Sequence, residues 1–299
     1  MTELNALIKR NCRLFFKDKG MFFTSLITPL ILLVLYVSFL GNVYRDVLIE
    51  IIPSELITDE NLIDGVVGGQ LVSSLLAVCC VTVAFCSNLL MVQDKTSGAE
   101  NDLYMTPVKP SVLALGYFIS SAAVTLIICY TALLLGMVYL FAVGWYLTFV
   151  DVLLLCLDVL LLVLFGTALS SLINCNLKTN GQASAVGTIV SSGYGFICGA
   201  YMPISNFGVG LQRVISFLPG TYATSLLRNH AMRSSFAKMS EINIPNELVD
   251  GIKKSLDCDL YFFDKQVPLY AMYIILACSV LLITAAYILV CRIKNKKHI

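Results

Sequence analysis

The chain has 299 residues, of which 58% are hydrophobic and 13% charged, and its mean hydropathy is +0.84. A composition this apolar excludes a single soluble domain of this length. The formal net charge of +1 says little by itself, because membrane topology follows the distribution of Lys and Arg rather than their sum.

Six stretches are long and apolar enough to cross a bilayer, which takes about 20 residues for about 30 Å of hydrocarbon. The stretches are Met21–Leu40, Gly65–Val92, Ser111–Ala142, Leu147–Ile173, Gly181–Ala200 and Val267–Cys291. Asp151 and Asp158 are the only carboxylates inside them. We therefore predict a single all-α membrane domain over residues 1–299, with six transmembrane helices.

Basic residues indicate the orientation. They gather before the first span, after the second and fourth spans, and after the sixth, whereas the short opposing loops contain Arg45 alone. Because short cytoplasmic loops carry the excess of Lys and Arg, both termini are expected in the cytoplasm of a multi-pass plasma membrane protein.

The first 64 residues contain two features outside the spans. Residues 1–20 repeat Leu4, Leu7 and Ile8 at helical spacing, which predicts an amphipathic interfacial helix; a plain positive flank is the alternative. Pro29 should kink the first span. Residues 41–64 form an acidic outer loop, either a solvated surface or an attractor for cationic substrates.

The connection Gln93–Pro110 has mixed charge and is compatible with a helix from Asp94 to Met105, which Pro107 and Pro110 would end. A short exposed helix between two spans would suit a partner protein. The alternative is a loop that caps two helices.

Residues 201–266 are apolar at first but interrupted by Gly and Pro. Such breaks at membrane depth are tolerated where backbone is buried in protein or lines a cavity. They predict short re-entrant or interfacial helices on the outer side, followed by a soluble stretch, Ser234–Lys265. An ordinary loop is the alternative.

The sequence offers little catalytic chemistry. It contains no phosphate-binding loop, and neither His230 nor His298 has an evident partner, so we expect no enzyme activity, cofactor or metal in this chain. The eleven cysteines mostly serve as small apolar residues, and whether Cys258 is oxidised is open. Asp158 is a possible intramembrane polar site, more consistent with a structural contact than with proton coupling.

The fifth span contains small residues at every fourth position, which allow two helix backbones to approach closely. They are Ala183, Gly187, Ser191, Gly195 and Gly199. The pattern does not show whether the partner helix belongs to this chain or to a second subunit.

Two local patterns, in this order along six spans, resemble the membrane permease subunit of type-2 ABC exporters. Gly98, Leu103, Thr106 and Pro107 match the family's coupling segment in register, whereas Thr96 and Asn101 stand where the family often has Glu. The family's outer motif matches Gly199 to Pro203 and Pro219 to Tyr222, with Arg228 following. We refer to residues 93–110 as the coupling segment.

The resemblance implies a permease dimer, with a second copy or a paralogue, in the lipid bilayer. A separate ATP-binding subunit would carry ATP and Mg and move a hydrophobic or amphipathic substrate (drug, lipid, peptide or glycan) outward; no nucleic acid is implied. It assigns ATPase coupling to Asp94, Gly98, Glu100, Leu103, Tyr104, Thr106 and Pro107, and an outer re-entrant motif to Pro203, Pro219 and Tyr222. The resemblance also implies that the small-residue ridge of the fifth span serves helix packing or the dimer contact. In this family the first and fifth spans would meet across the dimer, and the second and fifth spans would line the substrate path.

Two other classes remain as alternatives. A secondary transporter driven by an ion gradient would need paired intramembrane charges and a repeat between halves. The second class is a membrane enzyme or a non-transporting assembly factor, which would need a polar catalytic cluster near one interface that the sequence does not show.

Overall fold

The computed structural model describes residues 2–52, 60–242, 244–263 and 265–295. These residues are almost entirely helical, and a two-stranded antiparallel hairpin precedes the last helix. The elements are α1 (Thr2–Lys17), α2 (Lys19–Leu35), a π-helical turn (Tyr36–Leu40), α3 (Gly41–Ile51), α4 (Glu60–Ser87), α5 (Leu89–Ser97), α6 (Ala99–Tyr104), α7 (Pro110–Val143), α8 (Phe149–Asn174), α9 (Asn180–Ile197), a 3-10 turn (Ile204–Asn206), α10 (Val209–Ile215), α11 (Pro219–Glu241), α12 (Asn246–Ser255), β1 (Tyr261–Phe262), β2 (Lys265–Gln266) and α13 (Leu269–Asn295).

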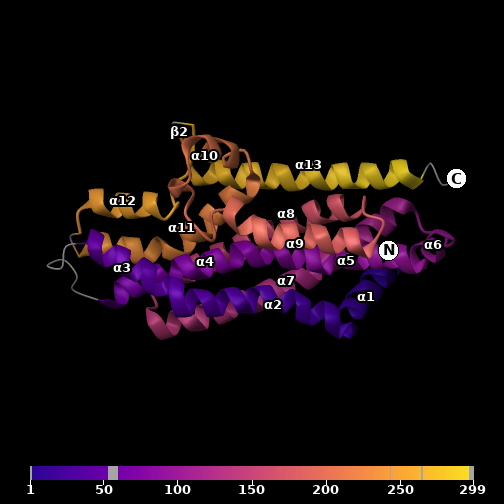
Figure 1. Cartoon of the computed structure of the whole chain (residues 1–299), viewed down its shortest axis with the longest axis horizontal. Coiled ribbons are helices and arrows are strands. Elements are labelled where there is room, and N and C mark those ends of the chain that lie inside the picture. The colour runs from indigo at the N-terminus through magenta and orange to yellow at the C-terminus, as the bar shows by residue number, and fades with distance from the viewer. Residues whose placement is uncertain (1, 53–59, 243, 264, 296–299) are drawn as a thin grey trace.

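The long helices run along one axis and form an elongated bundle (Figure 1). Both chain ends lie at the same end of this bundle, together with α6, and we call this the termini end. Helices α3 and α12 lie at the opposite end, which we call the distal end. The chain therefore returns to the side from which it starts.

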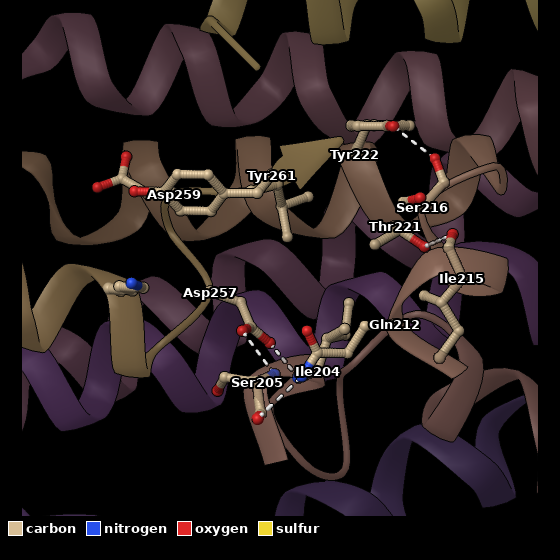
Figure 2. A pocket seen from close by; sticks show the side chains of 12 residues that line it. Ile204, Ser205, Gln212, Ile215, Ser216, Thr221, Tyr222, Asp257, Asp259 and Tyr261 are labelled. Carbon is tan, nitrogen blue, oxygen red and sulfur yellow. Dashed lines mark hydrogen bonds between the residues drawn. The ribbon is translucent and has the colours of Figure 1, made fainter. Parts of the chain in front are cut away.

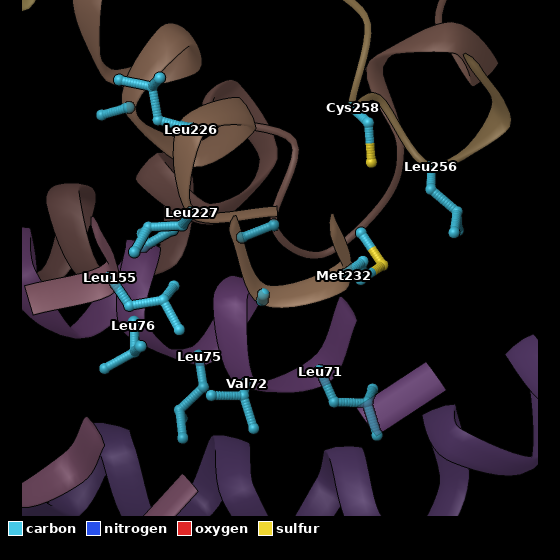
Figure 3. Close-up of a cluster of buried hydrophobic side chains, with 14 of the residues drawn as sticks. Leu71, Val72, Leu75, Leu76, Leu155, Leu226, Leu227, Met232, Leu256 and Cys258 are labelled. Atoms are coloured by element: carbon cyan, nitrogen blue, oxygen red, sulfur yellow. The ribbon is translucent and has the colours of Figure 1, made fainter. Parts of the chain in front are cut away.

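Helix α4 occupies the centre of the bundle and contacts α2, α3, α7, α8, α9 and α11. Small residues permit this, because a Cβ atom on Gly69 would lie 3.0 Å from the backbone oxygen of Ala231 in α11. Leucines and valines of α4 fill the space between it and its neighbours, as Figure 3 shows for Leu76 beside Leu155 of α8. The central helix is thus buried on all sides by protein.

Five helical segments in the described residues are long and apolar enough to cross a membrane. They are Lys19–Ile51, Asn61–Ser97, Pro110–Val143, Phe149–Asn174 and Leu269–Lys294. The predicted fifth span forms helix α9, whose Gly, Ser and Thr residues make it more polar than these five. An α-helical membrane protein is confirmed, whereas the count of six crossings stays a prediction.

The N-terminal helix exists as α1, and its apolar face packs on α7: Leu7 lies against Gly116, and Phe15 is buried. Helix α2 continues through Pro29, and the π-helical turn follows seven residues later.

Two predicted loops are wrong where the structure describes them. Residues 41–51 continue the first spanning helix as α3, and α4 already begins at Glu60. Arg45 of α3 pairs with Asp64 of α4 at 3.1 Å and joins the two helices. The acidic residues within 53–59, and the basic tail 296–299 with His298, lie outside the described residues.

The stretch Ser234–Lys265 is not simply a soluble loop. Helix α11 continues to Glu241 and packs on α4, α8 and α13, so Ser235, Phe236 and Met239 are buried. Apolar residues of α12, with Cys258, extend the same core at the distal end.

Candidate functional site

The coupling segment forms two short helices rather than one. Helix α5 ends at Gly98, whose φ of +83° is left-handed, and α6 starts directly after it. Glycine adopts this conformation without a Cβ penalty, which explains its place at the bend. Pro110 then begins α7 as its first residue, where a missing N–H is harmless.

The tip of α6 is open to solvent. Met105 is 89% exposed and Tyr104 is 41% exposed, and Thr106 and Pro107 are also exposed. The tip is held in shape from within: the Thr106 hydroxyl donates to the Leu103 carbonyl at 2.6 Å, and the Tyr104 hydroxyl bonds to Glu100 at 3.3 Å. Leu103 itself is partly buried against the core cluster that contains Tyr117. Met105, which the sequence did not single out, is therefore the most exposed apolar side chain of the segment.

Asp94 points into the protein instead. It accepts two hydrogen bonds from the Arg10 guanidinium, at 2.8 and 3.1 Å, and one from the Tyr117 hydroxyl at 2.6 Å. Such a bidentate, charge-assisted contact is both strong and directional. The bond to Asp94 raises the pKa of Arg10. Asp94 thus joins the coupling segment to α1 and α7.

The neighbouring Lys95 makes a second attachment, which the sequence did not indicate. Its ammonium group donates to the carbonyls of Asn174, Cys175 and Leu177, at 3.2, 2.8 and 3.4 Å. These carbonyls end α8, where the last turn has unpaired acceptors and a partial negative charge. Two consecutive residues of α5 therefore fix the coupling segment to three other elements.

The small-residue ridge of α9 is used partly inside the chain. Ala183 and Gly195 are buried, and a Cβ atom on Gly195 would come within 2.3 Å of the Tyr201 ring. A Cβ atom on Gly187 would meet nothing within 4 Å. Ser191 bonds to the Gly187 carbonyl at 2.8 Å. The middle of the ridge is open, whereas the part near Gly195 packs within the chain.

Gly199, the last residue of the ridge and the first of the outer motif, is hydrogen-bonded to one member of a buried ion pair. Gly199 has a φ of +76°, and its carbonyl accepts from the Arg228 guanidinium. Arg228 is 1% exposed and pairs with Asp257 at 3.2 Å, and Asp257 also accepts from the backbone N–H of Ile204. Burial raises the pKa of Asp257, while the Arg228 charge acts in the opposite direction. The ion pair joins α11 to the residues after α12, and the hydrogen bonds of its two members attach both to the turn after α9.

A small cavity of about 230 Å³, shown in Figure 2, lies beside the predicted outer motif, of which Tyr222 lines it and Pro203 and Pro219 do not. Pro203 precedes the 3-10 turn and Pro219 opens α11. The Tyr222 hydroxyl donates to the Ser216 carbonyl at 2.5 Å, closing the turn between α10 and α11. These residues shape the short helices, and the structure alone does not place them in a membrane.

Asp158 has partners that the sequence analysis failed to find. The His230 Nδ1 lies 2.6 Å from one oxygen of Asp158, and the Tyr273 hydroxyl donates to the other at 2.6 Å. His230 and Asp158 are both buried. The expectation that His230 has no partner is wrong, because α11 folds back against α8 and α13, whereas a polar contact between helices at Asp158 agrees with the expectation. The trio connects three helices.

A bundle of long apolar helices around a fully buried central helix defines a multi-pass α-helical membrane protein. An exposed helical bend lies between two of its long apolar helices. The chain belongs to the ABC-2 type transporter family, whose model matches residues 2–231. No curated protein matches the chain at a significant level. The family match covers the coupling segment, α9 and most of α11.

Proposed function

We propose that this chain is the membrane subunit of an ATP-driven exporter and that a separate ATP-binding subunit docks on α6. The exposed Met105, at the far end of the short helix that begins after the bend at Gly98, is the observation that carries this proposal. An apolar side chain held out by a short, internally hydrogen-bonded tip has the character of an anchor for a protein pocket.

The attachments of α5 supply a route for force. Movement of α6 would pull on Asp94 and Lys95, and through them on α1, α7 and the end of α8. Closure of the ATP-binding subunits would thus reach the spanning helices through polar contacts, while this chain would perform no nucleotide chemistry. ATP and Mg would bind to the partner subunit.

A second copy of this chain, or a paralogue, would cover the open faces of α2 and α9. Val34 of α2 and Ile189 of α9 are 64% and 69% exposed, and Gly187 offers room for a close approach. A substrate path between the two copies would be apolar, in agreement with a hydrophobic or amphipathic substrate. In the proposed orientation the termini end faces the cytoplasm.

Site-specific photo-crosslinking in the native host tests the docking site. A photoreactive phenylalanine derivative at Met105 should form an adduct with an ATP-binding subunit, identified by mass spectrometry. The same probe at Tyr270, which is 70% exposed but lies at the start of α13, is the matched control and should not. Adducts at position 105 that lack an ATP-binding protein would refute the proposal.

The buried pair of Asp158 and His230 gives one reason to test a gradient-driven transporter as well, since ionisable pairs within membranes often serve proton relays. The chain alone, reconstituted in vesicles with a proton gradient, should show no substrate efflux. Efflux that survives without an ATP-binding subunit and stops on collapse of the gradient would favour this second function.

A further inference from the structure

Two cysteines meet between α8 and α13 at the termini end. Cys175 ends α8 and is 4% exposed, and Cys291, in the last turns of α13, is partly exposed. Both belong to one apolar cluster with Tyr287, and the Cys175 thiol donates to the Leu172 carbonyl at 3.2 Å. Because Cys291 follows Tyr287 by four residues, both side chains are on the helix face that packs on α8.

Two ammonium groups surround this pair. Lys294 of α13 donates to the Cys175 carbonyl at 2.9 Å and to the Asn176 side chain at 2.7 Å. Lys95 of the coupling segment donates to the same Cys175 carbonyl at 2.8 Å. The contact from Lys294 fixes the end of α13 against the residue that carries the first thiol.

The neighbouring Cys291, aided by the charges of Lys294 and Lys95, lowers the pKa of Cys175, although burial acts in the opposite direction. A lowered pKa favours the thiolate, which is the reactive form of a cysteine. Cys175 thus differs from an inert buried cysteine, and its neighbour Cys291 is within reach of solvent.

A second pair in the same chain provides a contrast. Cys80 of α4 and Cys129 of α7 also lie in one apolar cluster. Both are 0% exposed and lie among apolar side chains of the central core. The Cys80 and Cys129 thiols are close together but cannot be reached by solvent. They therefore serve as a control for whether closeness of two thiols alone is enough to form a disulfide.

We propose that Cys175 and Cys291 are a redox modification site that forms a reversible disulfide between α8 and α13. This inference goes beyond the proposed function and does not depend on it. Disulfides in reducing compartments are usually transient and redox-sensing. The bond would join the end of α8 to α13 at the place where the coupling segment is attached.

The reaction needs a two-electron oxidant, for which oxidised glutathione is a cellular class and diamide a laboratory reagent. With diamide, the thiolate of the pair adds to one nitrogen of the N=N bond, and the other nitrogen takes a proton from water. The second sulfur then attacks the first, the S–N bond breaks, and its thiol proton goes to the departing nitrogen. The products are the disulfide and the hydrazine form of the reagent.

The test uses the full-length chain in membranes at pH 7. Diamide treatment is followed by alkylation of remaining thiols, proteolysis without reductant and mass spectrometry of linked peptides. We expect a Cys175–Cys291 link that dithiothreitol reverses and that is absent in Cys175→Ser and Cys291→Ser, with Cys80 and Cys129 still alkylated as free thiols. Failure of the link to form at a diamide concentration that oxidises glutathione in the same sample overturns the proposal, as does equally fast linkage of Cys80 to Cys129.

The Lys294→Gln variant tests the charge contribution. Removing this ammonium group should slow disulfide formation at pH 7 severalfold, because it raises the pKa of Cys175, and raising the pH to 9 should restore the rate. A rate equal to that of the unmodified chain at pH 7 would show that the thiols are not activated by their surroundings and would overturn the proposed reactivity. A slow rate that high pH does not restore would show that Lys294→Gln had separated the two thiols rather than changed their pKa. This result would also count against the proposed activation of Cys175 by charge.

Discussion

Replacing Met105 with Asp should uncouple the permease while leaving its own fold intact. Met105 is 89% exposed at the tip of α6, so the substitution breaks little inside the chain. Exposed substitutions away from structural features usually change the free energy of unfolding by no more than about 0.5 kcal/mol. A docked ATP-binding subunit, in contrast, would have to bury the new carboxylate.

The magnitude follows from the exposed side chain. Burying a methionine contributes about 1.5–3 kcal/mol, and the 89% exposure means that nearly all of this would be gained on docking. Its loss alone corresponds to about 10- to 150-fold weaker binding, since about 1.4 kcal/mol is a factor of ten. Desolvation of the carboxylate adds to this cost.

The assay compares binding of the ATP-binding subunit with thermal unfolding of the isolated permease in detergent. Met105→Leu keeps the apolar volume and should bind nearly as well as the unmodified chain. Leu103→Asp provides a contrast, because Leu103 is partly buried and its replacement should destabilise the permease as well. Undiminished binding of Met105→Asp would refute the assignment of Met105 as the anchor.

Three further predictions concern the fold around the site. Gly98→Ala places a Cβ in a left-handed conformation and should cost about 1–2 kcal/mol, measured as a lower unfolding temperature; an unchanged temperature would contradict the geometry of the bend. Arg228→Met leaves the Asp257 carboxylate buried without its cation and should cost about 3–5 kcal/mol, with part of the loss recovered when Asp257 is also made apolar; no recovery in the double variant would argue against the ion pair as the cause. Gly187→Leu should weaken dimer recovery in detergent without lowering the unfolding temperature of the chain, whereas Gly195→Leu should lower that temperature because Tyr201 occupies the space; equal effects of the two would argue against the separate uses of the ridge.

The sequence predicted the coupling segment well in outline. Its position between two spanning helices, its helical character and its end at Pro110 agree with the structure. The break at Gly98 was missed, because the residues on both sides of it favour a helix, and only the φ of +83° reveals the bend. A glycine in the middle of a short helical pattern was the available signal.

Partners across long sequence distances were not predictable. Asp94 meets Arg10 and Asp158 meets His230, and in each case the two residues come from helices far apart in the chain. A single sequence gives the residue types but no pairing, since many arrangements of the helices would satisfy the same hydropathy pattern. The error over His230 came from assigning it to short helices of the outer segment, when it lies in the long buried helix α11.

The sequence by itself determined that this chain is a helical membrane protein, because the length and polarity of a spanning segment are local properties fixed by the thickness of the bilayer core. Only the tertiary structure decided which helix occupies the centre, which small residues of α9 face inward, and which polar side chains meet. The physical reason is that lipid is as apolar as the helix surfaces, so side-chain shape and polar contacts between helices, rather than hydrophobicity, choose among the possible packings.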